Sequence, residues 1–354
     1  MKRVAEELGV SITTVSKVLN NRSDIGSATR ARVLDKVAEL GYRPNVIARS
    51  LTTRRTRSLG IVVPDLLHSF FVEIVAGIDA VARSRGYGLL ICSSNEDPRR
   101  EREEMEMLRQ RQVDGIVLAS VTASGNTDLL LDLATEGIGL VMIDRDDHAA
   151  VRCDRVLTDD QLVGEIATSH LLENGRRAIG HICGPRIAHA RRRTIGYRTA
   201  LKARDIAVKA EWMVPGGFME ADGYRGMTRL LALRPRIDAV FAANDPAAIG
   251  AMRAIWEAKR RIPDDVAVVG AGEIMMGDLL RVPLTTVSWS RNDLGKRAAE
   301  LILERVEPDP SAVFKRVILP PHLVPRLSSG ARAASRGRQP DNTAAHRDPG
   351  SASD

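Results

Sequence analysis

Residues 9–21, GVSITTVSKVLNN, combine short polar, methyl-bearing and cationic side chains at the spacing of a surface helix. Val15, Val18 and Leu19 recur at helical period and predict one buried stripe, and Ser11 stands where an N-cap is expected. The opposite face then exposes four side chains: Ile12, Thr13, Ser16 and Lys17. Such side chains suit phosphate oxygens and base edges in a DNA major groove. An ordinary amphipathic helical hairpin explains the same stretch equally well, so both interpretations stay open at this point.

Two further helices are expected around this one. Gly9 indicates the end of a helix that starts near the N-terminus, and Gly41 indicates the end of another that has Ser27 as its N-cap. The inner face of this last helix is expected from five residues: Val33, Leu34, Val37, Ala38 and Leu40. Three short helices that share an apolar face are typical of a helix-turn-helix domain, which we place at residues 1–43.

Residues 44–57 predict a short helix followed by a basic linker. Pro44 ends the preceding helix, and Asn45 can cap the new one. Its apolar side is expected from Val46, Ile47, Ala48 and Leu51. So short a helix is not stable alone in water, and a second copy of itself or DNA must hold it. The linker is basic because it contains Arg54, Arg55 and Arg57.

The excess positive charge of the chain is concentrated at its N-terminus. The 354 residues carry a net charge of +7, and residues 1–57 alone hold twelve Lys and Arg against five Asp and Glu. The rest of the chain is balanced. A general preference for arginine would spread the excess evenly, so its location favours a polyanion as the partner of this segment.

From Ser58 onward, short apolar runs alternate with amphipathic helical stretches. The expected strands are SLGIVVP, YGLLICSS, DGIVLAS, GLVMID, AIGHICG, DAVFAAND, VAVVGA and TTVSWS. Repeated β–α units predict a doubly wound α/β architecture, and residues 58–327 are long enough for two lobes. Ligands of such sheets bind outside the carboxyl ends of the strands, where a cleft between the lobes is expected. Residues 328–354, which are rich in Gly, Ser, Ala, Arg and Pro and carry no leucine heptad, are expected to be a disordered tail.

Other classes of protein find little support in the sequence. No apolar run approaches the roughly 20 residues that span a bilayer, and the N-terminus lacks a secretory signal. The three cysteines form no CxxC pair, as expected in a reducing cytoplasm. GAGEIMMG resembles a dinucleotide-binding loop, but Met275 stands in place of its third glycine. We expect no enzymatic activity, cofactor or metal; the alternative is a small-molecule-binding protein or enzyme with an accessory nucleic-acid-binding head.

The combined motifs resemble the lactose/galactose-repressor (LacI/GalR) family of bacterial transcription regulators over residues 1–327. The resemblance rests on VAEELGVSITTVSKVLNN, ELGYRPNVIARSL, GYRTAL, FAANDPAAIGAMRAI and PLTTV. It implies a cytoplasmic homodimer that binds a near-palindromic operator, most simply as a repressor, with an affinity controlled by a small molecule in the cleft.

The resemblance also implies which residues touch DNA. Those that would face the major groove are Ile12, Thr13 and Lys17, and those that would bind phosphates are Ser11, Thr14 and Ser16. A hinge helix containing Asn45, Ala48 and Leu51 would pair with its copy in the minor groove. There, Leu51 would wedge into the central base step and kink the duplex.

The core resembles sugar-binding proteins of the periplasmic type, built as two doubly wound lobes. Positions that match the family's effector contacts are Phe70, Phe71, Asp144, Arg193, Phe218 and Asp245. An aromatic wall with a few polar groups suits a small-molecule pocket. The two adjacent phenylalanines could instead be plain core residues, and Asp245 could instead cap the helix that follows it.

One departure from the family bears on the effector. The family usually has an Asp two residues after the glycine of VVG, where this chain has Gly272. The loss of a carboxylate beside Arg193 favours an acidic effector, such as a sugar phosphate or sugar acid, over a neutral sugar. Glu273 could also replace the missing Asp, and that alternative favours a neutral sugar.

Overall fold

The computed structural model describes residues 1–19, 22, 24–42, 55–66, 69–121, 125–145, 147–306 and 313–330. The expected hinge helix, with Asn45, Ala48 and Leu51, lies outside these residues, as does Arg54. The expected tail lies outside them from residue 331 onward.

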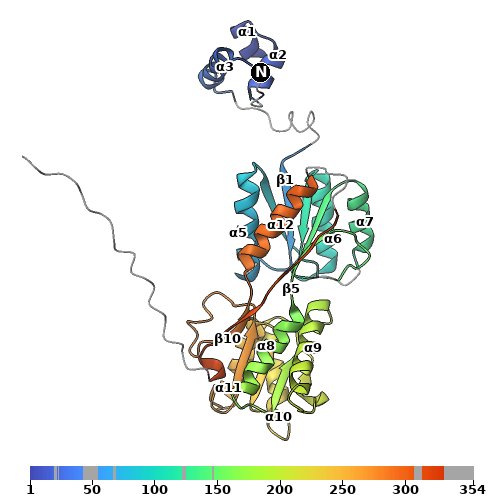
Figure 1. Ribbon diagram of the computed structural model, residues 1–354, viewed down its shortest axis with the longest axis vertical. Helices are drawn as coiled ribbons and strands as arrows, with labels where there is room; N and C mark the ends of the chain where they lie inside the picture. The colour runs from blue at the N-terminus through green and yellow to red at the C-terminus, as the bar shows by residue number, and fades with distance from the viewer. Residues whose placement is uncertain are drawn as a thin grey trace, which may run out of the picture.

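The N-terminal head, residues 1–42, is formed by helices α1 (Lys2–Leu8), α2 (Ile12–Leu19) and α3 (Ser27–Glu39) (Figure 1). Gly9 ends α1 with a φ of 65°, in the left-handed region that favours glycine. The Thr14 amide donates a hydrogen bond of 3.0 Å to Ser11 Oγ, as in a helix N-cap. The buried centre of the head comprises Val4, Ala5, Val15, Val18 and Val33. The expected three-helix domain is therefore confirmed.

The orientation of α3 differs in detail from the sequence interpretation. Leu34 is 45% exposed and Ala38 is also exposed, so neither belongs to the inner face. Only Val33 of this helix is fully buried, with Val37 and Leu40 packed at the edge of the cluster. Ser27 is the first helical residue rather than the cap, which is Gly26. With three small helices, the head has too little interior to bury a wider stripe.

The first lobe of the core is built on a parallel sheet with the strand order β11-β5-β4-β3-β1-β2. Its strands are β1 (Ser58–Val63), β2 (Gly88–Ser93), β3 (Gly115–Leu118), β4 (Gly139–Ile143), β5 (Asp154–Thr158) and β11 (Arg316–Leu319). Helices α5 (Ser69–Ser84) and α12 (Arg291–Val306) pack on one face (Figure 1). Helices α6 (Pro98–Gln110) and α7 (Thr127–Thr135) pack on the other. Alternate residues of β1 show this division, because Ile61 faces α5 and Val62 faces α6.

The second lobe repeats this plan with the strand order β12-β10-β9-β8-β6-β7, in which only β12 is antiparallel to its neighbour. Its strands are β6 (Ile179–Ile182), β7 (Met213–Val214), β8 (Ala239–Ala242), β9 (Ala267–Ala271), β10 (Thr285–Ser288) and β12 (His322–Val324). Helices α8 (Asp160–Glu173) and α9 (Ala188–Lys202) cover one face. Helices α10 (Glu220–Ala232) and α11 (Asp245–Glu257) cover the other, and η1 (Ala210–Trp212) precedes β7.

The chain passes between the lobes three times, from β5 to α8, from β10 to α12 and from β11 to β12 (Figure 1). The two-lobed doubly wound core expected from the sequence is thus confirmed, and all eight expected strands form. The strands β5, β7, β11 and β12 were not expected, because β7 and β12 are only two and three residues long and β5 and β11 each contain an arginine. In the part of the chain that is described, no helix combines the length and apolar character needed to cross a membrane.

Three helix pairs in the core pack backbone against backbone through reciprocal glycines. The pairs are Gly77 with Gly295 between α5 and α12, Gly164 with Gly196 between α8 and α9, and Gly223 with Gly250 between α10 and α11. A Cβ placed on Gly164 would lie 2.1 Å from the Arg193 carbonyl oxygen, and one on Gly196 would lie 2.0 Å from that of Gln161. These contacts fix α8 against α9, the helices that carry Asp160 and Arg193.

The end of the ordered core lies beyond the boundary expected from the sequence. Ser328 and Ser329, assigned above to the tail, are fully buried in the short helix η2 (Leu327–Ser329). The Ser328 hydroxyl donates to the Val268 carbonyl at 2.7 Å and accepts from the Thr285 amide at 2.8 Å. The composition of this segment resembles a linker, yet its hydroxyls complete the backbone hydrogen bonding of the second sheet.

Candidate functional site

A cavity between the lobes lies at the carboxyl ends of strands from both sheets, as expected for doubly wound folds. The space between its walls is about 570 Å³ when the open solvent at its mouth is counted, and the room inside it is about 60 Å³. The residues that line it and follow strand ends are Asp65, Glu96, Asp144, Arg145, Asn244, Gly272 and Trp289. The remaining lining comes from Phe70, Phe71, His189, Arg193, Phe218, Met219 and Ala271.

Aromatic rings form opposite walls of this cavity. Phe70 lies edge-on to Trp289, with ring centroids 5.7 Å apart. On the second lobe, His189 stacks on Phe218 with centroids 5.0 Å apart. Three of the five phenylalanines of the chain thus line one cavity, although the chain is only 3% aromatic. Phe70 and Phe71 also belong to the buried core, so these two side chains both pack in the core and line the cavity.

Arg193 is held at the cavity wall by a buried carboxylate. Its Nε donates to Asp160 Oδ1 at 2.9 Å, and its Nη1 donates to the Ala243 carbonyl at 2.7 Å. Both charged side chains are almost inaccessible to water. Burial raises the pKa of the Asp160 carboxyl to about 6, and the nearby Arg193 guanidinium opposes that rise. The guanidinium also lies 5.2 Å from the centre of the Trp289 ring.

Arg145 is the second buried guanidinium of the cavity. Its Nη1 and Nη2 donate to the two carboxylate oxygens of Glu96 at 3.1 and 2.7 Å. Its Nε is 3.9 Å from Asp144 Oδ2, and its guanidinium lies 5.8 Å from the Phe218 ring centre on the other lobe. Each arginine is therefore paired with a carboxylate, and three carboxyl side chains line the cavity beside two guanidinium groups.

Three polar atoms of the cavity lining are buried and have no hydrogen-bond partner within the described chain: Arg145 Nε, His189 Nδ1 and Trp289 Nε1. Burial holds the pKa of His189 well below its usual range, and the neighbouring Arg193 lowers it further. The ring is consequently neutral and can give or accept one hydrogen bond. Unsatisfied buried polar atoms are costly, so each of the three is a candidate for a hydrogen bond with a bound ligand.

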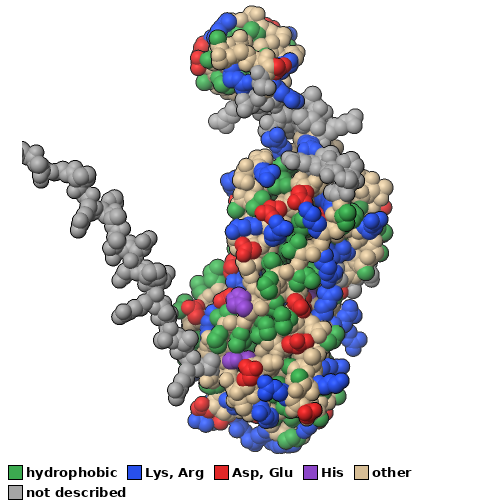
Figure 2. All heavy atoms as spheres, viewed as in Figure 1, with side chains coloured by type: hydrophobic (Ala, Val, Ile, Leu, Met, Phe, Trp, Pro, Cys, Tyr) green, Lys and Arg blue, Asp and Glu red, His purple; other side chains and the backbone are tan. Residues whose placement is uncertain are grey.

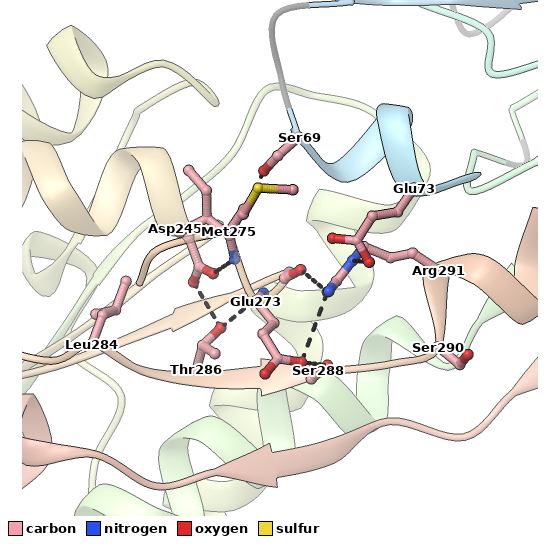
Figure 3. Close-up of polar contacts among 12 residues, drawn as sticks. Ser69, Glu73, Asp245, Glu273, Met275, Leu284, Thr286, Ser288, Ser290 and Arg291 are labelled. Carbon is pink, nitrogen blue, oxygen red and sulfur yellow. Dashed lines mark hydrogen bonds and ion pairs between the residues drawn. The ribbon is translucent and has the colours of Figure 1, made fainter. Parts of the chain in front are cut away.

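Asp245, unlike the other five expected effector residues, does not line the cavity. Its carboxylate accepts hydrogen bonds from Thr286 Oγ1 and from the Ile274 amide, both at 2.7 Å (Figure 3). Burial raises its pKa, and the hydrogen bond from Thr286 opposes the rise. Its neighbour Asn244 lines the cavity instead and also caps α11, by accepting from the Ala247 amide.

The loop that contains Gly272 explains why no carboxylate takes the family position. Gly272 has a φ of +118°, which side chains rarely adopt, and its carbonyl accepts from Arg291. Glu273 does not line the cavity, and its carboxylate accepts hydrogen bonds from Ser288 (Figure 3) and from Arg326. Glu273 therefore does not replace the missing Asp.

Several lining residues were not singled out in the sequence: Asp65, Glu96, Arg145, His189, Met219, Asn244 and Trp289. A signal for most of them exists, because Asp65, Glu96, Arg145, Asn244 and Trp289 follow the ends of observed strands by one to three residues, although the expected runs DAVFAAND and TTVSWS extend past Asn244 and Trp289. Applying the strand-end rule to every strand would have found these positions. His189 and Met219 carry no such signal, since both lie at helix starts whose orientation depends on the tertiary fold.

The second candidate site is the exposed face of α2 in the head. Ile12 is 48% exposed, Thr13 is exposed, and Ser16 and Lys17 are partly exposed, while Val15 and Val18 face inward. Lys17 Nζ lies 2.6 Å from Asp24 Oδ2. Ser11 and Thr14 share a hydroxyl–hydroxyl contact of 2.9 Å at the start of the helix. The face is thus polar, cationic and accessible at its expected positions. Over the core face seen in Figure 2, Lys and Arg are interspersed with Asp and Glu.

Family models match both parts of the chain. Residues 1–45 match the model described as "Bacterial regulatory proteins, lacI family". Residues 56–325 match "Periplasmic binding proteins and sugar binding domain of LacI family".

Similar proteins of known type extend over nearly the whole chain. The HTH-type transcriptional repressor PurR of Mannheimia succiniciproducens is 35% identical, with 93% of this chain and 98% of that protein covered. The ribose operon repressor of Escherichia coli is 32% identical, with 93% and 99% covered. A structure of the lac repressor dimer bound to operator and the anti-inducer ONPF matches with a TM-score of 0.81 at 26% identity, covering 93% and 98%. A CelR–cellobiose complex matches with a TM-score of 0.72 at 30% identity, covering 92% and 98%. The chain described here belongs to the LacI family of bacterial transcription regulators.

Proposed function

We propose that this protein is a sequence-specific DNA-binding regulator, acting as a repressor, whose operator affinity is controlled by a small molecule bound between the core lobes. The observation that carries the proposal is the cavity itself. Its walls come from both lobes of a core joined to a helix-turn-helix head, so a ligand that fills it changes the relative stability of the lobe arrangements.

Helix α2 is the element that reads DNA in this proposal. Its exposed positions are those that the family resemblance assigns to the major groove and to phosphates. Lys17 exchanges its contact with Asp24 for DNA when the head binds. A head of three short helices covers few base pairs, and a near-palindromic operator read by a homodimer supplies the second half-site.

The effector that best fits the cavity is a neutral polyhydroxyl compound of the sugar type. Both guanidinium groups are already neutralised, by Glu96 and Asp160, and lining carboxyl groups outnumber them. An anion would have to displace a carboxylate from a buried ion pair, which is costly. The charges of the cavity therefore argue against the acidic effector favoured by the sequence. Relatives named for ribose and cellobiose supply the first compounds to test.

Contacts between the lobes next to the cavity offer a route from effector to DNA. The Met275 amide of the second lobe donates to Ser69 Oγ of α5 at 3.3 Å. Arg291 forms an ion pair with Glu73 of α5 at 3.0 Å and also binds the Gly272 carbonyl in the cavity lining (Figure 3). A ligand that contacts Gly272 can therefore shift this loop and change the hydrogen bonds that join the two lobes. The effect then reaches the end of the first lobe from which the chain leaves toward the head.

Two measurements on the full chain test this function. Fragments bound from random DNA should converge on a near-palindromic sequence. Calorimetric titration should show D-ribose or cellobiose binding more tightly than D-ribose 5-phosphate, with a loss of binding in Arg193→Ala. Arg191→Ala is the matched control, since Arg191 lies on the same helix with a largely exposed side chain.

Two other outcomes would reject the proposal in part or in full. Tighter binding of the phosphate would restore the acidic effector. Sugar binding with no enrichment of any DNA sequence would favour a small-molecule-binding protein.

A further inference from the structure

A single carboxylate holds the first residues of the core that follow the head. Asp114 lies in the turn before β3 and is half-buried. Its Oδ1 accepts from the Thr56 amide at 2.9 Å and from the Thr56 hydroxyl at 3.1 Å. Its Oδ2 accepts from the Arg57 amide at 2.9 Å. Three hydrogen bonds to one charged group fix two consecutive residues just before β1 begins.

The backbone at this point is strained and is held from both sides. Arg57 has a φ of 52°, a left-handed conformation that side chains other than glycine rarely adopt. Its amide is bound by Asp114, and its carbonyl accepts from the Gly88 amide at 2.9 Å. The Thr56 hydroxyl shares its single proton between Asp114 and the Gln112 carbonyl, which lies 2.9 Å away. Such a conformation persists only where the surroundings enforce it, and Asp114 binds the amides of both Arg57 and the residue before it.

The second lobe contains the same arrangement without a chain leaving it. Asp238 precedes β8 as Asp114 precedes β3, and its carboxylate accepts from the Arg177 and Ala178 amides, both at 3.0 Å. The amide of each aspartate donates at 2.9 Å to a backbone carbonyl of the neighbouring segment. In the second lobe, the residues so held only connect α8 to β6. In the first lobe, they connect the core to the DNA-binding head.

The geometry points to Asp114 as a positioning residue for DNA binding. It fixes the direction in which the chain leaves the first lobe toward the head, at the end of the lobe where β1 begins (Figure 1). Two heads of a dimer must reach half-sites at one spacing, so a fixed exit direction favours the specific complex. Non-specific binding depends on positive charge rather than on half-site spacing and gains little from it. Asp114 itself touches neither DNA nor effector in this role.

The test compares two equivalent substitutions in the full-length protein, Asp114→Asn and Asp238→Asn. Each keeps the size of the side chain but offers one acceptor oxygen in place of two. The probes are a DNA fragment selected from random DNA by the wild-type protein and an unrelated fragment of equal length. We expect Asp114→Asn to lower the ratio of the two affinities by about tenfold or more, as the loss of charge-assisted hydrogen bonds predicts. Asp238→Asn should leave the ratio unchanged at a similar loss of thermal stability.

A second readout separates positioning from a merely structural role. Amide hydrogen exchange at residues 55–58 should rise in Asp114→Asn and stay unchanged in Asp238→Asn. If Asp114→Asn fails to fold, Thr56→Ala removes the hydroxyl contacts with Asp114 and with the Gln112 carbonyl and should lower the affinity ratio in the same direction. An unchanged ratio in the folded variant, or an equal fall with Asp238→Asn, would overturn the proposal. Failure of the wild-type protein to select any fragment would instead reject the DNA-binding function on which it rests.

Discussion

Replacing Gly164 by Ala tests how closely the packing of α8 on α9 supports the effector cavity. An ideal Cβ on this glycine would lie 2.1 Å from the Arg193 carbonyl oxygen and 3.0 Å from the Tyr197 amide nitrogen. Both are backbone atoms of α9, so no side-chain rotation can relieve the overlap. The overlapping atoms must separate by roughly 1.4 Å or more, since carbon contacts are optimal near 3.5–4.0 Å.

The expected magnitude follows from two opposing effects. Alanine in a helix is more favourable than glycine by about 0.5–1 kcal/mol. Overpacking of a well-packed interior costs about 1–3 kcal/mol, and a clash with rigid backbone belongs at the upper end of that range or beyond. We therefore expect a net loss of roughly 2 kcal/mol in the free energy of unfolding. That loss would lower the urea midpoint by roughly 0.5–1 M.

The same variant should also weaken effector binding, because α8 carries Asp160 and α9 carries Arg193. Urea unfolding followed by circular dichroism measures the first effect, and calorimetric titration with D-ribose or cellobiose measures the second. Gly226→Ala is the control, since the three atoms nearest to a Cβ there are side-chain atoms of Ile182 and Val214, at 2.9 Å or more. A Gly164→Ala variant with an unchanged or higher midpoint would refute the packing argument.

Three further predictions concern the DNA-reading face, the cavity and pH. Lys17→Ala should reduce the ratio of operator affinity to random-DNA affinity by about tenfold or more, since it removes a cation from the DNA-reading face. An unchanged ratio in gel-shift titrations would show that α2 does not read the DNA sequence. Trp289→Phe removes the unpaired Nε1 donor but keeps an aromatic ring. Sugar affinity measured by calorimetry should therefore fall by a factor of about 5–10, while the melting temperature stays nearly constant. Equal affinity would show that Nε1 does not bind the sugar. Burial lowers the pKa of His181 to about 4, below its value in the unfolded chain. The unfolded state therefore binds more protons than the folded state between about pH 4 and 6.5, so the stability that neutral His181 contributes is lost as the pH falls through this range. Relative to His181→Gln, wild-type protein should lose about 2 kcal/mol of stability between pH 7 and 5, and parallel urea midpoints for the two proteins would contradict the assignment.

Much of the fold could be predicted from the sequence because the hydrophobic periodicity and the capping and turn residues indicate the same helices and strands. Gly9, Ser11 and the stripe of Val15 and Val18 specify α2 locally, and the structure forms it as expected. The apolar runs of the two sheets are equally explicit. Leu34 was misplaced because the helical period allows a wider inner face than so small a head can bury. Ser328 was misplaced because composition alone does not show that a hydroxyl completes the hydrogen bonds of a distant strand.

The site was only partly readable, because its details depend on tertiary contacts. Asn244 and Asp245 are adjacent in the sequence, and only the direction of the backbone after β8 decides which of the two side chains faces the cavity. The charge of the cavity was misjudged for a similar reason. Arg193 suggests an anion when read alone, but Asp160, 33 residues earlier, neutralises it in the folded core. Glu96 does the same for Arg145 across two strand ends.

The central claim is that filling the cavity between the lobes changes how tightly the head binds its operator. The most direct test is a fluorescence anisotropy titration of a selected DNA fragment with the full-length protein, without and with a saturating sugar shown by calorimetry to bind. A shift of about 5–150-fold in operator affinity, abolished in Arg193→Ala, is the predicted result. Identical operator affinity with the cavity empty and with the cavity filled would contradict the account.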